Sequence, residues 1–285
     1  MELLKIAVQK SGRLHDDSMR LLKEAGIKFD NAVDQLKARS HTFPAEVLFL
    51  RNSDIPQYLK DGVVHAAILG ENVIIEKGGH CTIVQKLGFS KCRLSLAVPK
   101  NQPYEGLHFF QNKKIATSYP NTLKKFLDEQ GIRADYHQIS GSVEIAPNIG
   151  LADGICDLVS TGSTLFKNGL REVHTILQSE ACLVRTQNLS VGLTALFDKL
   201  TFRIKAVQAS RNNKYILLNV PNEKIDTIAQ ILPGMKSPTV VPLVREGWSS
   251  LHSVISENDF WEVIDQLKAA GAQGILIVPI EKMVL

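Results

Sequence analysis

A short apolar run followed at once by a turn of small hydroxyl residues is the feature that most constrains this fold. Residues 155–160 (Ile-Cys-Asp-Leu-Val-Ser) have the character of a buried strand. Residues 161–164 (Thr-Gly-Ser-Thr) then turn the chain, and a helix is expected to open at Leu165. Such a loop lets backbone N–H groups approach an anion closely. It favours a phosphate cradle; an ordinary strand–turn–helix connection stays open, since neither a Walker loop nor a dinucleotide fingerprint is present.

Three carboxylates accompany this loop in the sequence. Glu144, Asp153 and Asp157 are groups of the kind that hold sugar hydroxyls, or a magnesium ion beside a polyphosphate. Asp is also a common capping residue, so a structural role competes with the functional one.

Length and charge limit the class of protein. A chain of 285 residues suggests two or three domains, and a hydrophobic content of 44% is typical of a globular protein with a sizeable core. The net charge of +4 is dispersed along the chain. It suits anionic small molecules and is too weak to indicate a nucleic-acid partner.

Targeting and redox signals point to the cytoplasm. The N-terminus lacks the apolar core of a signal peptide, and no stretch approaches the roughly 18 apolar residues of a membrane span. The four cysteines, at positions 81, 92, 156 and 182, form no close pair, and the eight histidines form no metal cluster. We therefore expect neither zinc sites nor disulfides, and a reducing compartment.

Strand and helix signals alternate over the first 210 residues. The strands are expected at 3–8, 45–50, 66–70, 93–99, 114–117, 136–139, 155–160, 171–177 and 181–184. The helices are expected from an Asp16 cap to Ala25, and at 55–61, 121–130, 146–151 and 189–207. This order predicts parallel sheets with right-handed crossovers, in two similar α/β lobes with a ligand cleft between them.

The last 74 residues have a different order. Strand, helix, strand, strand, helix and strand follow one another at 215–220, 223–232, 239–243, 250–255, 259–270 and 275–279, which is the ferredoxin-like pattern. The predicted domains are lobe I at 1–94, with 182–211 returning to it, an inserted lobe II at 95–181, and a C-terminal domain at 212–285. Residues 210–213 are predicted to be a short polar linker.

Basic residues lie near several of the predicted strand ends. Lys10 and Arg13 follow the first strand, Arg51 follows the second, and Arg93 opens a later one. Each is a candidate anion ligand because strand ends are the usual place for ligand contacts in α/β folds. Each taken alone is as compatible with a solvated turn or a surface ion pair.

A series of ordered motifs runs over essentially the whole chain. The motifs lie at 9–14 (Gln-Lys-Ser-Gly-Arg-Leu), 70–72, 92–97, 115–120, 141–144, 150–153, 157–165, 168–173 and 278–283. In these motifs the chain resembles the long-form ATP phosphoribosyltransferases of histidine biosynthesis, some members of which carry Glu at the position of Ser160. The resemblance implies a two-lobed, periplasmic-binding-protein-like catalytic body with a C-terminal ferredoxin-like regulatory domain.

The resemblance also implies a reaction. The adenine N1 of ATP attacks the anomeric carbon of 5-phosphoribosyl 1-pyrophosphate, and pyrophosphate leaves. No covalent nucleophile is expected, because N1 already carries a lone pair, and the general acid or base stays unassigned. The protein must position two polyanions and stabilise the departing charge.

The resemblance further implies site residues. Phosphoribosyl pyrophosphate is expected to contact Glu144, Asp153, Asp157, Thr161, Gly162, Ser163 and Thr164, with magnesium on Asp153 and Asp157. ATP is expected to contact Lys10, Arg13, Arg51, Glu71, Arg93 and Tyr119. For Glu71 and Tyr119, support of the fold is the competing interpretation.

Regulation and assembly are implied in the same way. Histidine is expected to inhibit through the segments that hold Thr239, Leu251 and Ala272, for which simple packing is the alternative. Dimers and hexamers of identical chains are expected. The rival class is a non-catalytic nucleotide or anion sensor on the same two-lobed fold.

Overall fold

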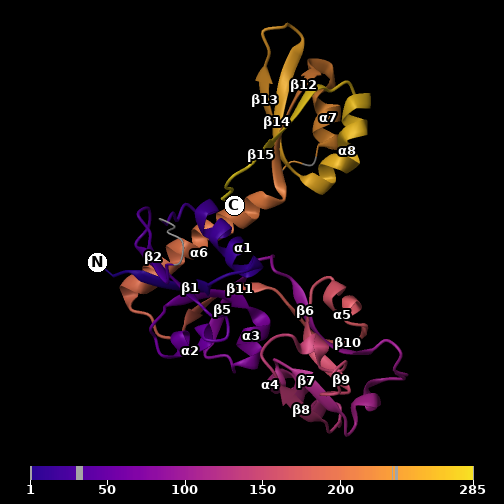
Figure 1. The fold of residues 1–285 in the computed structure, drawn as a ribbon. Coiled ribbons are helices and arrows are strands. Elements are labelled where there is room, and N and C mark those ends of the chain that lie inside the picture. The colour runs from indigo at the N-terminus through magenta and orange to yellow at the C-terminus, as the bar shows by residue number, and fades with distance from the viewer. Residues whose placement is uncertain (1, 30–34, 233, 235–236, 285) are drawn as a thin grey trace. The chain divides into compact units, whose positions relative to one another are not determined.

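A computed structural model describes residues 2–29, 35–232, 234 and 237–284 of the chain. The chain forms two compact units (Figure 1). The first contains Met1–Lys23 and Ile27–Phe197, and the second contains Glu24–Gly26 and Asp198–Leu285.

A six-stranded mixed sheet forms the core of lobe I, with the order β2-β3-β1-β4-β11-β5. The strands are β1 (Leu4–Gln9), β2 (Lys37–Arg39), β3 (Ala45–Leu50), β4 (Ala66–Gly70), β5 (Cys81–Lys86) and β11 (Ala181–Thr186). β1 pairs in parallel with β3 and β4, as predicted. β2, β11 and β5 are antiparallel to their neighbours, so the prediction of a purely parallel sheet was wrong. β11 is antiparallel to β4, and the chain enters it on its return from lobe II.

Three helices accompany this sheet: α1 (Arg13–Glu24), α2 (Ile55–Lys60) and α3 (Glu71–Glu76). α1 begins three residues before the predicted cap, since the N–H of Asp16 already donates to the Gly12 carbonyl at 3.1 Å. α3 was not predicted; it follows β4 without a loop. Its buried Val73 and Ile74 belong to the same apolar cluster as Leu59 of α2.

Lobe II is built on a five-stranded sheet with the order β10-β6-β9-β7-β8. The strands are β6 (Cys92–Pro99), β7 (Lys114–Thr117), β8 (Asp135–Gln138), β9 (Gly154–Val159) and β10 (Leu170–Ser179). β7 pairs in parallel with β8 and β9, whereas β6 is antiparallel to both β9 and β10. This sheet is therefore also mixed. The helical segments are η1 (Leu107–Phe110), α4 (Pro120–Glu129), η2 (Val143–Ile145) and α5 (Ser163–Lys167).

The helix predicted at 146–151 is absent from this described part of the chain. A 3-10 turn at η2 is followed by hydrogen-bonded turns, in which the N–H of Leu151 reaches the Ala146 carbonyl at 3.0 Å. Gly150 has a φ of 74°, which a right-handed helix does not accept, so the turns cannot continue as a helix.

Two neighbouring stretches of backbone connect the lobes. Cys92 opens β6 and pairs with Ser179 at the end of β10. Just beyond them, the N–H of Ala181 donates to the Phe89 carbonyl at 3.0 Å. Lobe II is thus an insertion that leaves and rejoins lobe I side by side; the exact boundaries at 94/95 and 181/182 stay a prediction.

A buried carboxylate also joins the lobes. Glu76, at the end of α3, is 6% exposed and accepts hydrogen bonds at the first turn of α4. The donors are the N–H of Asn121 at 3.0 Å, and the N–H and hydroxyl of Thr122 at 2.8 and 2.7 Å. Tyr119, at the N-cap position, makes no side-chain cap bond, so Glu76 supplies the acceptor that the helix itself lacks.

The C-terminal unit has the ferredoxin-like order that the sequence predicts. Its sheet runs β13-β14-β12-β15 and is antiparallel throughout. Two helices pack against the sheet, with Leu218, Leu251 and Leu267 in the shared core. The elements are β12 (Asn213–Pro221), η3 (Asn222–Lys224), α7 (Ile225–Ile231), β13 (Thr239–Pro242), β14 (Trp248–Ser256), α8 (Glu257–Ala269) and β15 (Gln273–Pro279).

The predicted linker at 210–213 is instead continuous structure. Helix α6 (Val191–Arg211) extends to Arg211, and β12 begins at Asn213. Ser210 is 4% exposed, and its hydroxyl donates to the carbonyls of Val207 and Glu281.

Among the described residues, no helix combines the length and apolarity that a bilayer span requires. All four cysteines are free thiols.

The Glu76 cap generates a stability prediction. Glu76→Gln replaces a charged acceptor by an amide whose NH₂ faces backbone donors, and it should lower the free energy of unfolding by about 1–3 kcal/mol. Urea unfolding at neutral pH measures this loss. Glu129→Gln, at the exposed far end of the same helix, serves as the control and should stay within about 0.5 kcal/mol. A Glu76→Gln variant as stable as the control would contradict the capping role.

Candidate active site

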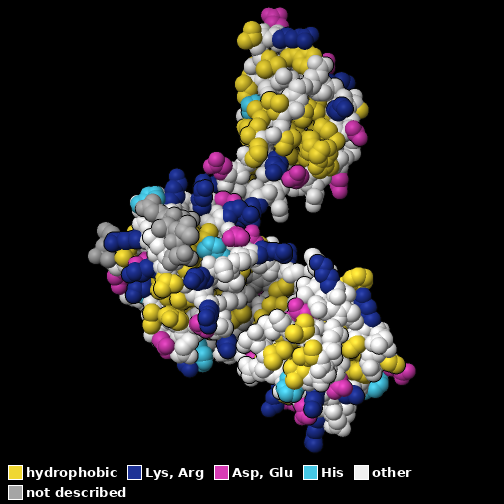
Figure 2. Space-filling view, viewed as in Figure 1, with side chains coloured by type: hydrophobic (Ala, Val, Ile, Leu, Met, Phe, Trp, Pro, Cys, Tyr) yellow, Lys and Arg dark blue, Asp and Glu magenta, His cyan; other side chains and the backbone are white. Residues whose placement is uncertain are grey.

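A cleft of about 580 Å³ lies in the first unit and is lined by residues of both lobes. Lobe I supplies Gln9, Arg13, Leu14, Asn52, Gly70, Asn72 and Ser90; Cys92 lies at the crossing; lobe II supplies Glu144 and residues 157–165. The predicted loop therefore borders a cavity large enough for a small-molecule ligand. Lysine and arginine side chains are dispersed over the face seen in Figure 2, in keeping with the dispersed charge of the sequence.

The loop after β9 has the form of the predicted cradle. Gly162 has a φ of 80°, a conformation that glycine adopts without a steric penalty. The hydroxyl of Thr161 donates to that of Ser163 at 3.1 Å. α5 opens at Ser163, two residues earlier than predicted. Thr161, Gly162, Ser163 and Thr164 all line the cleft, so hydroxyl and backbone groups border the same space.

Two of the predicted carboxylates lie in this cleft. Asp157, on β9, and Glu144, on η2, both line it. The pKa of the Asp157 carboxyl is raised from 3.8 to about 6. Burial is the main cause; the hydrogen bond from the N–H of Leu158, at 2.8 Å, opposes the rise, and the charge of Glu144 adds to it. Asp157 is thus an anion at neutral pH, although its surroundings favour the protonated form.

Asp153 does not join these carboxylates. Asp153 immediately precedes β9 and lies four residues before Asp157, and four residues of a strand span about 13 Å. Its Oδ2 accepts the Lys114 N–H at 2.9 Å, and its Oδ1 lies 3.5 Å from Lys113 Nζ. The predicted pairing of Asp153 with Asp157 around magnesium is therefore corrected: Asp153 braces the opposite end of the strand. Within the described residues, no group of three or more His, Cys, Asp and Glu side chains could hold a metal.

The predicted ATP ligands divide into two groups. Arg13, the first residue of α1, lines the cleft with an exposed side chain. Lys10 and Arg51 are exposed and follow the parallel strands β1 and β3, and the Lys10 N–H donates to the Leu50 carbonyl at 2.8 Å. They lie at the same edge of the sheet as Arg13, but they are not among the residues that line the cleft.

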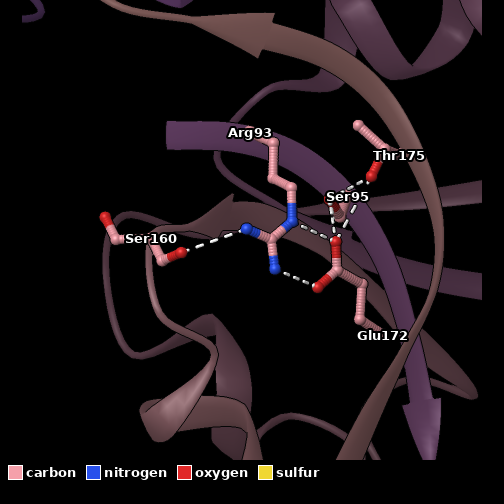
Figure 3. Close-up of polar contacts among 5 residues, drawn as sticks. All are labelled: Arg93, Ser95, Ser160, Glu172 and Thr175. Carbon is pink, nitrogen blue, oxygen red and sulfur yellow. Dashed lines mark hydrogen bonds and ion pairs between the residues drawn. The ribbon is translucent and has the colours of Figure 1, made fainter. Parts of the chain in front are cut away.

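Glu71, Arg93 and Tyr119 are engaged within the protein. Glu71 pairs with Lys86 at 2.9 Å. The Tyr119 hydroxyl accepts a hydrogen bond from Asn72 at 3.1 Å, and burial raises its pKa well above the usual range. Arg93 forms a two-pronged ion pair with Glu172 (Figure 3). For these three residues the structure favours support of the fold over substrate contact.

Polar residues that sequence reasoning did not select complete the lining. Gln9 and Asn52 stand next to predicted strand ends, and Asn72 lies in a quoted motif, so their positions were a usable signal. The amide oxygen of Asn52 is buried and has no hydrogen-bond partner among the described residues. A buried acceptor without a partner is costly, and a bound ligand with a donor group would satisfy it.

The predicted effector residues do not form an open site. Leu251 and Ala272 are 0% and 7% exposed, and both belong to the apolar core of the C-terminal unit. Thr239, on β13, is exposed opposite His252. Packing accounts for the first two side chains, and Thr239 alone of the three is accessible; histidine binding at these segments stays a prediction.

The fold and cleft define a two-lobed α/β protein with a small-molecule-sized cleft lined by both lobes. Residues 51–206 match the family description "ATP phosphoribosyltransferase", and residues 210–282 match "HisG, C-terminal domain". The ATP phosphoribosyltransferase of Parabacteroides distasonis is 54% identical over 99% of this chain and 100% of its own length. That of Cytophaga hutchinsonii is 54% identical over 99% of both chains. The chain belongs to the ATP phosphoribosyltransferase family.

Solved structures agree with this assignment. The ATP phosphoribosyl transferase (HisG:HisZ) complex from Thermotoga maritima matches with a TM-score of 0.61 and 28% identity, over 71% of this chain and 99% of that one. The substrate-binding protein of an amino acid ABC transporter matches with a TM-score of 0.50 and 13% identity, over 73% and 94% of the two chains. The second match shows a shared fold only, and together they support the predicted fold class.

The raised pKa of Asp157 generates a pH prediction. A carboxyl whose folded pKa is raised contributes stability below its unfolded pKa, and that contribution is lost as pH rises through about 6. Asp157→Asn should therefore gain stability relative to the parent protein as the pH rises from 4.5 to 7.5, by about 2 kcal/mol. Urea unfolding of both proteins across this range measures the difference.

A second variant tests the cause of the shift. Glu144→Gln removes a charge that raises the pKa of Asp157, so the midpoint of the pH dependence should move to lower pH. A stability difference between Asp157→Asn and the parent protein that stays flat from pH 4.5 to 7.5 would show that Asp157 is not perturbed.

Proposed function

We propose that this protein transfers the 5-phosphoribosyl group of phosphoribosyl pyrophosphate to N1 of ATP, the first step of histidine biosynthesis. The observation that carries the proposal is the cleft in which the hydroxyl and glycine loop at 161–164 meets two carboxylates and Arg13. Membership of the ATP phosphoribosyltransferase family supports the same reaction.

Phosphoribosyl pyrophosphate is assigned to lobe II. Thr161, Gly162, Ser163 and Thr164 hold its 5-phosphate through hydroxyl and N–H groups. The transition state carries positive charge on the ribose ring, and the carboxylates of Asp157 and Glu144 stabilise that charge. They also accept hydrogen bonds from the ribose hydroxyls. These roles require Asp157 to be ionised, which favours pH values above about 6.

ATP is assigned to the edge of lobe I. Arg13, with Lys10 and Arg51 on the neighbouring strand ends, neutralises its phosphates. The unpartnered amide oxygen of Asn52 accepts a hydrogen bond from ATP or from the ribose. The cleft walls position N1 against the anomeric carbon, and positioning is the larger part of catalysis when no covalent intermediate forms.

The cleft residues fit a magnesium ion. Mg²⁺ is usually held by one or two carboxylates together with substrate phosphates, and Asp157 and Glu144 are two carboxylates in one cavity. When bound there, the ion would neutralise charge on the departing pyrophosphate. Asp153 has no part in this site.

The C-terminal unit is assigned to regulation by histidine, and the chain to dimers and hexamers in the cytoplasm. The match of residues 210–282 to the family's C-terminal domain supports a separate role for this unit. Feedback requires that histidine bind one state of the protein better than another. The proposal keeps the predicted division of the body into lobes at 1–94 with 182–211, and at 95–181.

A non-catalytic nucleotide or anion sensor is the second candidate. The likeness to a substrate-binding protein favours it at the level of the fold. The paired carboxylates beside the phosphate loop weigh against it, because a sensor needs to hold an anion and has no use for groups that stabilise a cationic sugar.

The function has a direct test. The purified protein should release pyrophosphate only when ATP, phosphoribosyl pyrophosphate and magnesium are all present, and chelation of magnesium should stop the release. A coupled assay for inorganic pyrophosphate measures it. ATP binding without any release would support the sensor instead.

A pair of arginine variants sharpens this test. Arg13→Ala should raise the KM for ATP about tenfold or more, since one charge-assisted contact contributes roughly 1.5–3 kcal/mol. Arg20→Ala, on the same helix, removes a surface pair with Asp17 and should leave the KM unchanged. Equal effects of the two variants would remove Arg13 from the ATP site.

The regulatory assignment makes its own prediction. Histidine should inhibit pyrophosphate release, and Thr239→Val should raise the concentration needed for half-inhibition severalfold, through loss of an exposed hydroxyl. Thr227→Val, an exposed threonine on α7 of the same unit, is the control and should leave inhibition unchanged. Inhibition that is unaffected by Thr239→Val would exclude Thr239 from the effector site.

A further inference from the structure

Arg93 contacts Ser160, the residue before the 161–164 loop, and is not among the residues that line the cleft. Its guanidinium pairs with Glu172, and its remaining nitrogen donates to the Ser160 carbonyl at 3.0 Å (Figure 3). We propose that Arg93 is a positioning residue, which fixes the start of the 161–164 loop and thereby the binding of phosphoribosyl pyrophosphate. The inference rests on the proposed function and deepens it.

The network is assembled on one face of the lobe II sheet. Arg93 and Ser95 are two residues apart on β6 and so share a face, and Thr175 of β10 lies opposite Ser95. Glu172 and Thr175 are three apart, which in a regular strand puts them on opposite faces. The register shifts between Glu172 and His174, and this irregularity brings Glu172 to the face of Arg93.

Glu172 determines the orientation of the guanidinium. Its two oxygens lie 2.5 Å from Nε and Nη2 of Arg93, and the hydroxyls of Ser95 and Thr175 donate to Oε1 at 2.8 and 3.3 Å. The hydrogen bond from Arg93 is the main cause that lowers the pKa of Glu172, so this carboxylate stays charged. Because the guanidinium is planar, binding two of its nitrogens sets the direction of the third.

The third nitrogen holds a carbonyl that the sheet leaves without a strand partner. β9 ends at Val159, which is the residue paired with Arg93, and Ser160 is the first residue beyond the ladder. The Ser160 carbonyl and the Thr161 N–H belong to one rigid, trans peptide plane and point in opposite directions. Holding the carbonyl therefore fixes the direction of the first N–H of the loop.

Kinetic measurements distinguish this positioning role from direct contact with ATP and from a purely structural role. In Arg93→Lys, the single ammonium cannot bind Glu172 at two points and also reach Ser160. We expect the KM for phosphoribosyl pyrophosphate to rise about tenfold or more, equivalent to about 1.4 kcal/mol, with the KM for ATP within about twofold of the parent value. Arg211→Lys, the same change at the ion pair with Glu24, is the control and should alter neither KM.

Each other result has a definite meaning. A rise confined to the KM for ATP would make Arg93 a substrate cation and overturn the inference. Unchanged KM values with a lower melting temperature would make it a brace of the fold only. Absence of pyrophosphate release from the parent protein would overturn the proposed function, and this inference with it.

Glu172→Gln is the second variant, and it decides the question if Arg93→Lys fails to fold. It leaves Arg93 in place but removes the charge that orients it. A selective rise in the KM for phosphoribosyl pyrophosphate, smaller than that of Arg93→Lys, would support the inference, and an unchanged KM would overturn it.

Discussion

The cleft depends on the position of β6 between β9 and β10. As the central partner of two antiparallel neighbours, β6 aligns Ser95 with Asp157 on one side and with Thr175 on the other. The same strand carries Arg93, which supports the loop at the end of β9. One set of backbone hydrogen bonds therefore positions the 161–164 loop, Asp157 and the ion pair between Arg93 and Glu172. A slip of one residue in the pairing of β6 would turn its side chains to the other face of the sheet.

The order of strands and helices was largely predictable from the sequence, because short apolar runs bounded by glycine and proline carry that signal. The ferredoxin-like unit and the turn at 161–164 followed from it. The elements β2, β5 and α3 were not predicted. β2 has only three residues, β5 is a mostly exposed edge strand, and α3 follows β4 without a turn between them. Strand direction in the sheets also failed, because it depends on how distant parts of the chain return to the sheet. The turn at 146–151 was mistaken for a helix because Pro147 is typical of a first helical turn, whereas the left-handed conformation of Gly150 could not be foreseen.

The chemical type of the site residues was predictable from the sequence, but their interaction partners were not. The sequence shows that Arg93 is basic. It does not show that its guanidinium forms an ion pair with Glu172, which is distant in the chain. Asp153 and Asp157 are close in sequence, yet a strand separates residues far more than a helix does, and Asp153 ends beside Lys114. Asn52 shows the reverse: an unremarked amide becomes notable only when the structure leaves its oxygen buried and unpartnered.

The insertion of lobe II has a consequence for how such a chain is built. β5 and β11, which flank the inserted segment, are themselves paired antiparallel, with Lys86 opposite Cys182. A chain that passed directly from one to the other would form an ordinary β-hairpin at the edge of the sheet, and lobe I would keep its strand order. Lobe II thus occupies the position of a hairpin loop, the kind of site where folds accept insertions without disturbing their core.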